Sequence, residues 1–178
     1  DWAHPRRIDL GLVEEAFKGS AFLKFEGIEG QPQGVQQKTF LARLAEVSGR
    51  REYRMLRTSS WTDILTCLSE YLATRAAKEP VVVLLDEFQW MAAGRTQLVS
   101  SLKYVWDNHL LKKHRVHLIV CGSVGSFIVK KVVRSRALYG RVHLEINLKP
   151  LRLPEIKGVF HPPRSLLDVV ELYMTLGG

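Results

Sequence analysis

The chain has 178 residues, of which 46% are hydrophobic and 25% charged, a composition typical of a globular protein large enough to bury a core. No run of about 18 apolar residues is present, and this predicts no membrane span. The N-terminal residues DWAHPRR lack the apolar region of a secretory signal. The two cysteines stand in no metal-ligand spacing, so we expect reduced thiols and a cytoplasmic protein.

The formal net charge is +8, which raises the question of an acidic partner such as DNA. The basic residues come in three groups: Arg50, Arg51, Arg54 and Arg57; Lys112, Lys113, His114 and Arg115; and Lys130, Lys131, Arg134 and Arg136. They carry no interleaved aromatic residues and no known nucleic-acid motif. Two interpretations stay open: solvated faces, or a surface for DNA or a DNA-associated protein.

The first half of the chain predicts a helix, a strand and two further helices. Residues 12–18 suit a helix, and residues 21–27 form a short alternating apolar run that suits a strand ended by glycine. Residues 28–35 contain glycines and a proline and predict a loop. Apolar residues at helical spacing predict helices over 36–49, which ends on a glycine, and over 59–77.

Two residues mark the start of the helix expected over 59–77. Ser60 is a favourable N-cap residue, and Asp63 follows it by three positions. This spacing predicts the acidic version of a capping box, in which each side chain bonds to the other residue's backbone N–H group.

The strongest functional pattern is VVVLLDEFQW, residues 81–90. Five consecutive apolar residues without alternation predict a strand buried on both faces, as in a parallel sheet. Asp86 and Glu87 would then enter the ligand crevice at the carboxyl end of the strand. This is the arrangement of a Walker B motif, in which Asp86 would hold Mg²⁺ and Glu87 would orient the attacking water. The alternative is a strand that ends in two solvated acids.

The segments that follow favour the functional interpretation. Residues 96–111 predict a helix, 116–123 a second buried strand, and 124–136 another helix. Residues 138–151 predict a tight glycine turn, an arginine and a third strand. Ser123 ends the second strand, where its side chain could sense a γ-phosphate or serve tight packing. Alternating strands and helices predict an α/β fold, a three-layer αβα sandwich with a mainly parallel sheet.

The segments LLDEFQW, YVWDNHL, HLIVCGS, LYGRVHLEINLKPL and ELYMTLGG occur in an order that resembles the archaeal-type ATPases. These belong to the STAND/AAA+ division of P-loop NTPases, and the resemblance covers about residues 6–178. It implies an ATP-binding and ATP-hydrolysing core with Mg²⁺ over residues 1–160, and the start of a helical lid over residues 161–178. It also implies that Arg141 acts as an arginine sensor or finger. The alternative for Arg141 is a local salt bridge, and oligomers are compatible with the family.

The resemblance also aligns a phosphate-binding loop with residues 6–11. Its cofactor-binding positions would be Arg6, Arg7, Ile8, Asp9, Leu10 and Gly11. Leu10 stands where a lysine would neutralise phosphate charge, and Gly11 stands where a hydroxyl would bind Mg²⁺. Asp9 adds a carboxylate near the anion. We therefore expect very slow hydrolysis, unless a loop has been omitted between Ile8 and Asp9, where a break in the Cα–Cα spacing would show it.

A second departure from the family lies at the ends of the chain. The family has an apolar strand before its phosphate loop, where this chain has DWAHP, and a helical lid after TLGG. We therefore expect a P-loop NTPase-like fold that is incomplete at the N-terminal strand and at the C-terminal lid. The strand expected after LYGR would lose its neighbour. Three hypotheses follow: a Mg²⁺-dependent ATPase, a catalytically inactive remnant that acts as an interaction module, or a basic nucleic-acid-associated module.

Overall fold

The computed structural model describes residues 13–94, 97–110, 115–123, 125–147, 152, 155 and 165–176. The chain divides into two compact units. One unit is Phe17–Glu145, and the other combines Asp1–Ala16 with Ile146–Gly178.

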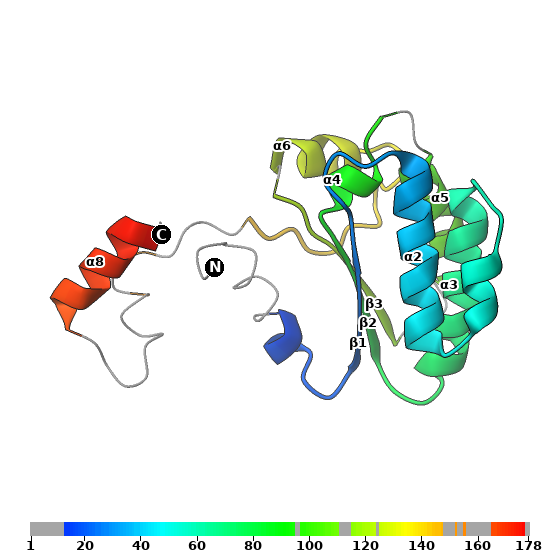
Figure 1. Ribbon diagram of the computed structural model, residues 1–178, viewed down its shortest axis with the longest axis horizontal. Helices are drawn as coiled ribbons and strands as arrows, with labels where there is room; N and C mark the ends of the chain where they lie inside the picture. The colour runs from blue at the N-terminus through cyan, green and yellow to red at the C-terminus, as the bar shows by residue number, and fades with distance from the viewer. Residues whose placement is uncertain are drawn as a thin grey trace. The chain divides into compact units, whose positions relative to one another are not determined.

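Three parallel strands form the sheet of the unit Phe17–Glu145. They are β1 (Ala21–Glu26), β2 (Val81–Asp86) and β3 (Val116–Val120), in the order β1-β2-β3. Glu26 lies opposite Asp86, and Leu85 opposite Val120. All three strands therefore end at the same edge of the sheet, where Figure 1 shows the short helices α4 and α6.

The central strand β2 is buried on both faces, as its apolar run predicts. Val81, Val83 and Leu85 point into the main hydrophobic core. Val82 and Leu84 alternate to the opposite face and are also buried, with exposed fractions of 0% and 2%. A strand without an exposed face needs no polar alternation, which explains the continuous run VVVLL.

Helices α2 (Gln33–Ser48) and α3 (Trp61–Ala76) lie side by side on one face of the sheet (Figure 1). Between them lies the 3₁₀ helix η1 (Arg51–Met55). Next to α3 packs α5 (Leu98–Val105), which continues as the π-helical turn η2 (Trp106–Leu110). The core between these helices and the sheet includes the stacked rings of Phe25 and Phe40, whose centroids lie 4.1 Å apart.

The helix boundaries depart from the sequence predictions in two places. The prediction that residues 28–35 form a loop is wrong at its end, because α2 begins at Gln33. Pro32 takes the N-cap position in an extended conformation that suits the start of a helix. At the other end Gly49 adopts a left-handed conformation with φ of 71°, which confirms the predicted glycine cap.

The capping box predicted for α3 forms only in part. The Ser60 hydroxyl accepts a hydrogen bond from the Asp63 N–H group at 3.3 Å, as expected. The reciprocal bond is replaced, because the Ser60 N–H group donates to the hydroxyl of Thr58. That hydroxyl in turn donates to the Asp63 carboxylate at 2.8 Å. The Thr58 hydroxyl therefore links the Ser60 N–H group to the Asp63 carboxylate, which were expected to bond directly.

Short helices follow the carboxyl ends of β2 and β3. Helix α4 (Phe88–Met91) comes directly after β2, and α6 (Gly125–Ile128) follows β3 and continues as the π-helical turn η3 (Val129–Val133). The glycine turn predicted at Gly140 is present, with φ of 72°.

The strand predicted within residues 138–151 is wrong for the part that the structure describes. Residues 142–147 form no regular structure, and most of their side chains are exposed. Residues 148–151 lie outside the described part. A strand needs a paired neighbour to satisfy its backbone groups, and no further strand of the described residues pairs with β1 or β3 on the outer side. This agrees with the expectation that the segment would lack a neighbour.

The second unit contributes helical residues 13–16 and helix α8 (Leu166–Leu176). Residues 13–16 lie within the helix expected over 12–18. Within the described residues, no helix is long and apolar enough to cross a membrane. The division into a core over 1–160 and a lid over 161–178 stays a prediction.

The α/β class and the parallel sheet are confirmed. Strands connected by helices, with all carboxyl ends at one edge, give a P-loop-like α/β fold. In such a sheet ligands bind outside the carboxyl ends of the strands, which directs attention to the end of β2.

Candidate active site at the carboxyl end of the central strand

Asp86 is the last residue of β2, and its carboxylate is held from two sides. Oδ1 accepts a hydrogen bond from the Glu87 N–H group at 2.9 Å. Oδ2 forms an ion pair with the Lys24 ammonium group at 2.8 Å. Lys24 comes from the neighbouring strand β1 and makes a second ion pair of 2.8 Å with Glu26. The structure thus supplies Asp86 with a cationic partner from β1.

The ion pairs change the protonation of Lys24. Partial burial works to lower its pKa, but hydrogen bonds to Asp86 and then to Glu26 outweigh that effect. The pKa of Lys24 therefore lies above its ordinary value, and the side chain stays charged at neutral pH. A metal ion that binds Asp86 at Oδ2 would have to displace this ammonium group.

Glu87 leaves the strand in a backbone conformation that is unusual for its residue type. Its φ of 49° lies in the left-handed region, and within the described part of the chain it is the one residue other than glycine with a positive φ. Such conformations cost about 1–3 kcal/mol and persist where surrounding structure imposes them. The next residue is fixed as well, because the Phe88 N–H group donates to the Cys121 carbonyl at 3.0 Å.

Two glycines leave room for this turn. A Cβ atom on Gly27, at the end of β1, would collide with the Glu87 carbonyl and would lie 3.1 Å from the Met91 nitrogen. A Cβ atom on Gly122, after β3, would collide with the Gln89 side-chain oxygen. The turn that carries Glu87 therefore fits between the neighbouring strand ends only because both positions lack side chains.

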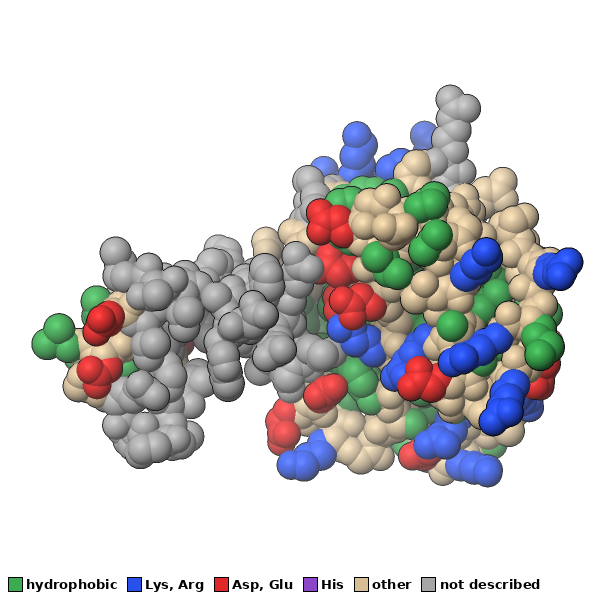
Figure 2. Space-filling view, viewed as in Figure 1, with side chains coloured by type: hydrophobic (Ala, Val, Ile, Leu, Met, Phe, Trp, Pro, Cys, Tyr) green, Lys and Arg blue, Asp and Glu red, His purple; other side chains and the backbone are tan. Residues whose placement is uncertain are grey.

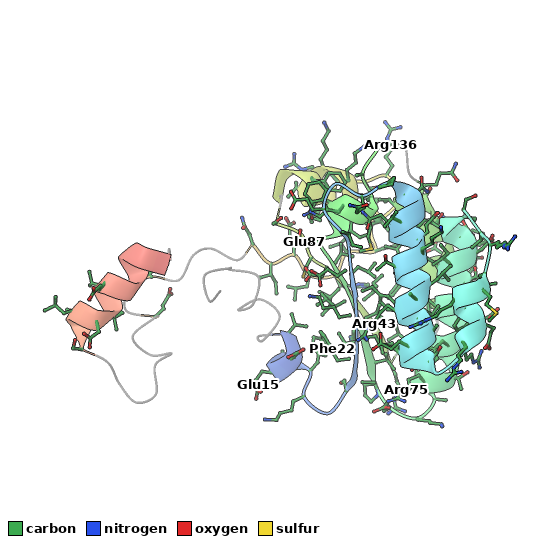
Figure 3. All side chains as sticks on the ribbon, viewed as in Figure 1. Glu15, Phe22, Arg43, Arg75, Glu87 and Arg136 are labelled. Atoms are coloured by element: carbon green, nitrogen blue, oxygen red, sulfur yellow. The ribbon has the colours of Figure 1, made fainter. Side chains whose placement is uncertain are left out.

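The Glu87 side chain points into a small polar cluster made of Glu87, Gln89 and Ser123. The Gln89 amide nitrogen donates to Glu87 Oε2 and to the Ser123 hydroxyl, the latter at 3.1 Å. The Ser123 hydroxyl donates to the same Glu87 oxygen at 3.2 Å. Glu87 is 3% exposed and Gln89 5%, whereas Ser123 is exposed. Figure 3 shows Glu87 at the end of the sheet near α4. Two residues predicted for the site, Glu87 and Ser123, are thus brought together.

The orientation of the Gln89 amide follows from its neighbours. If the amide were turned round, its oxygen would face the Glu87 carboxylate, which accepts hydrogen bonds and repels another acceptor. In the observed orientation Gln89 Oε1 has no hydrogen-bond partner among the described residues. A buried acceptor without a partner destabilises the folded state by about 1–3 kcal/mol. The two hydrogen bonds from the Gln89 amide nitrogen, to Glu87 and Ser123, offset this cost.

Arg141 lies in a local salt bridge. Its Nε and Nη2 atoms donate to the two carboxylate oxygens of Asp107, at 2.6 and 2.8 Å, and its Nη1 atom donates to the Tyr139 carbonyl at 2.9 Å. Lys103 makes a further ion pair with Asp107 at 3.0 Å. Hydrogen bonds from Arg141, followed by those from Lys103, lower the pKa of Asp107 to about 2. The catalytic role of Arg141 stays a prediction, and in this arrangement the guanidinium group joins η2 to the turn at residues 138–141.

The remaining site residues from the sequence lie outside the described part of the chain. They are Arg6, Arg7, Ile8, Asp9, Leu10 and Gly11. Their assignment to a phosphate loop therefore stays a prediction, as does an omitted segment between Ile8 and Asp9.

The donor set fits a magnesium ion better than a metal held by protein groups alone. Within the described residues, no three His, Cys, Asp or Glu side chains gather into a group that could hold a metal. Mg²⁺ commonly binds proteins through one or two carboxylates and takes its other ligands from phosphates and water. Asp86, whose side chain is 17% exposed at the end of β2, can supply such a carboxylate.

Two residues of this site were missed from the sequence. Lys24 could have been found from the alternation in β1, since it lies on the face opposite Leu23 and Phe25, but its register against Asp86 requires the pairing of distant strands. Gln89 lies within the segment LLDEFQW, where no local pattern indicates a role for it. Its contact with Glu87 depends on the left-handed backbone at Glu87, which no residue type there predicts.

The parallel sheet with paired carboxylates at the end of its central strand defines a P-loop-like α/β domain. Comparison with known families identifies the protein family within this fold class. A family described as "ATPase domain predominantly from Archaea" matches residues 15–178, and the chain belongs to this family. The match begins after residues 6–11, so it does not test the proposed phosphate loop.

Two curated proteins of Methanocaldococcus jannaschii are similar to parts of the chain. The uncharacterized protein MJECL04 is 30% identical over 93 residues, which are 52% of this chain and 21% of that protein. The uncharacterized protein MJ0424 is 37% identical over 59 residues, which are 33% of this chain and 56% of that protein. The matches thus span less than two thirds of either relative.

Proposed function

We propose that the domain binds Mg·ATP at the carboxyl end of its sheet and hydrolyses it slowly. The observation that carries this proposal is the pair Asp86 and Glu87 at the end of β2, with Ser123 from the loop after β3 bonded to Glu87. Membership in an ATPase family supports nucleotide and metal use in general.

Each residue has a distinct chemical task in this proposal. Asp86 would hold Mg²⁺, which when bound neutralises phosphate charge. The Glu87 carboxylate would accept a hydrogen bond from the attacking water and orient it. Ser123, whose hydroxyl is exposed beside Glu87, would donate to a γ-phosphate oxygen. Arg141 is the candidate for stabilising developing charge, provided that it leaves Asp107.

Slow turnover follows from residues 9–11 if these form the phosphate loop. Leu10 cannot neutralise the β- and γ-phosphates as a lysine would, and Gly11 supplies no hydroxyl to the metal. Lys24 lies next to Asp86, but it already neutralises that carboxylate and Glu26.

The first experiment measures Mg·ATP binding to the chain by calorimetry. We expect binding that is lost in Asp86→Ala, because that variant removes the carboxylate for the metal. Hydrolysis is then followed in single turnovers, where Glu87→Gln should reduce the rate by about 100-fold or more, the usual scale for general-base catalysis. Thr74→Ala, a change on the exposed surface of α3, is the control variant.

Two results would contradict the proposal. Absence of binding at millimolar Mg·ATP would mean that the fold does not bind the nucleotide. Turnover of about 1 s⁻¹ or faster, a rate within the ordinary range for enzymes, would show that the expectation of slow hydrolysis is wrong.

The second candidate is an inactive interaction module for DNA or a DNA-associated protein. In the described part of the chain, Lys130, Lys131, Arg134 and Arg136 are exposed on and after α6 and η3. Figure 2, however, shows lysine and arginine side chains spread over the visible face, and Figure 3 labels Arg136 at the same end of the unit as Glu87. Binding to DNA that weakens steeply with salt would favour this candidate, and a flat response would exclude it.

A further inference from the structure

The cluster of Glu87, Gln89 and Ser123 contains a carboxylate whose hydrogen bonds oppose its proposed task. A general base must offer its oxygen to a water molecule. Here Glu87 Oε2 already accepts from the Gln89 amide and from the Ser123 hydroxyl, and the residue is 3% exposed. Hydrogen bonds to a charged acceptor are stronger than those between neutral groups, so both donors restrain the carboxylate.

The position of Gln89 is itself fixed by packing. Gln89 is 5% exposed, and the space for its amide depends on the missing side chain at Gly122. Its second donor contact, to Ser123 at 3.1 Å, ties the amide to the loop after β3. The amide therefore cannot turn away from Glu87 without losing two contacts, even though its oxygen has no partner among the described residues.

Ser123 connects this buried pair to the outside. Its residue is exposed, and its hydroxyl is both the donor to Glu87 and the acceptor for Gln89. A phosphate oxygen accepts hydrogen bonds strongly and would compete with Glu87 for the serine proton. A ligand can thus reach the cluster through Ser123, and it would withdraw the serine donor from Glu87.

We infer that Gln89 is a positioning residue that restrains the Glu87 carboxylate in the nucleotide-free protein, and that a phosphate group at Ser123 releases it. The inference rests on the proposed function, because it concerns the regulation of the same site. The restraint prevents Glu87 from activating water until a phosphate has arrived.

The test measures how fast the Glu87 carboxylate reacts in the nucleotide-free chain. A carbodiimide with glycine ethyl ester labels accessible carboxylates, and mass spectrometry reports the rate at Glu87 relative to exposed Glu46. The variant Gln89→Met keeps length and flexibility but removes the donor. We expect labelling of Glu87 to become about tenfold faster, the factor that corresponds to the loss of one hydrogen bond to a charged group.

Two further variants separate the restraint from a general loss of structure. Gln37→Met makes the same chemical change at a glutamine that is 3% exposed and donates to the Ser59 carbonyl, away from the cluster. Its Glu87 labelling should equal that of the wild type. Ser123→Ala removes the other donor at an exposed position, and it should also speed labelling of Glu87. It thus tests the restraint even if Gln89→Met fails to fold.

Kinetics give an independent readout. In single turnovers Gln89→Met should leave the Kd for Mg·ATP unchanged, because Gln89 acts on Glu87 and not on the nucleotide. It should not lower the rate of hydrolysis, because bound phosphate has already released Glu87 in the wild type. Unchanged labelling of Glu87 in both Gln89→Met and Ser123→Ala would overturn the inference, as would a lower hydrolysis rate at unchanged Kd. Failure of Mg·ATP to bind the wild type would instead refute the proposed function, and the labelling rates would still decide whether Gln89 restrains Glu87.

Discussion

Gly27 shows how a residue without a side chain determines the geometry of the candidate site. It follows β1, and its N–H group donates to the Asp86 carbonyl at 2.9 Å. Because a Cβ atom there would collide with the Glu87 carbonyl, a backbone group, no side-chain rotation can relieve the clash. The turn of Glu87 therefore depends on Gly27 as much as on its own sequence.

We predict that Gly27→Ala lowers the free energy of unfolding by about 1–3 kcal/mol, the usual cost of forcing extra volume into a packed site. The matched control is Gly34→Ala. Gly34 lies in the first turn of α2 with open space around it, so the change should be neutral or stabilise by about 1 kcal/mol. Urea unfolding of both variants gives the comparison, and equal effects would show that the contact at Gly27 is relieved by movement of the turn.

At the scale of elements, the salt bridge of Arg141 and Asp107 joins η2 to the glycine turn at residues 138–141. The folded state lowers the pKa of Asp107 to about 2, whereas the unfolded value is about 3.9. A lowered pKa means that the carboxylate stabilises the fold when it is ionised. The stabilisation is therefore complete above about pH 4 and is lost as the pH falls towards about 2.

We predict that Asp107→Asn is less stable than the wild type at neutral pH and that the difference shrinks between about pH 4 and pH 2. Urea unfolding at a series of pH values measures it. Arg141→Met is the companion variant, since removal of the first donor should weaken the same acid dependence. A difference that stays constant through this pH range would contradict the assignment.

The elements also show what the sequence could and could not predict. The strands and the ends of α2 and α3 follow from local patterns, because burial on two faces, a glycine cap and a serine cap are each visible in a few residues. The expected strand after Gly140 could not be excluded locally, because whether it forms depends on a neighbouring strand. For the candidate site too, local patterns identify some residues, and others depend on contacts between distant segments. Asp86, Glu87 and Ser123 were found from strand ends, but Lys24 and Gln89 required register and backbone conformation.

At the scale of the whole molecule, the main hydrophobic core lies within one unit. Its buried residues run from Leu23 to Leu138, and all fall within Phe17–Glu145. The candidate site at the end of β2 belongs to the same unit. This unit therefore holds the interactions that a cooperative fold requires.

We predict that a fragment of residues 17–145 folds by itself and unfolds in one cooperative transition. Circular dichroism during thermal unfolding tests this. A fragment of residues 17–115 is the control, because it lacks β3 and leaves one edge of β2 without its partner. It should lose the cooperative transition. A gradual transition in the longer fragment would mean that the core needs residues of the other unit.

At position 87 the residue type that the proposed chemistry requires differs from the residue types that best suit the left-handed backbone. Glycine would adopt a φ of 49° with less strain, by roughly 1 kcal/mol, because it has no Cβ atom to clash with the following carbonyl. Asparagine also tolerates this conformation better than glutamate, because its short side chain can hydrogen-bond locally. A library of variants selected only for resistance to heat or protease should therefore enrich glycine and asparagine at position 87. A library selected for turnover of ATP should retain glutamate there. Retention of glutamate under selection for turnover, and its loss under selection for stability, would show that Glu87 serves chemistry at a cost to the stability of the fold.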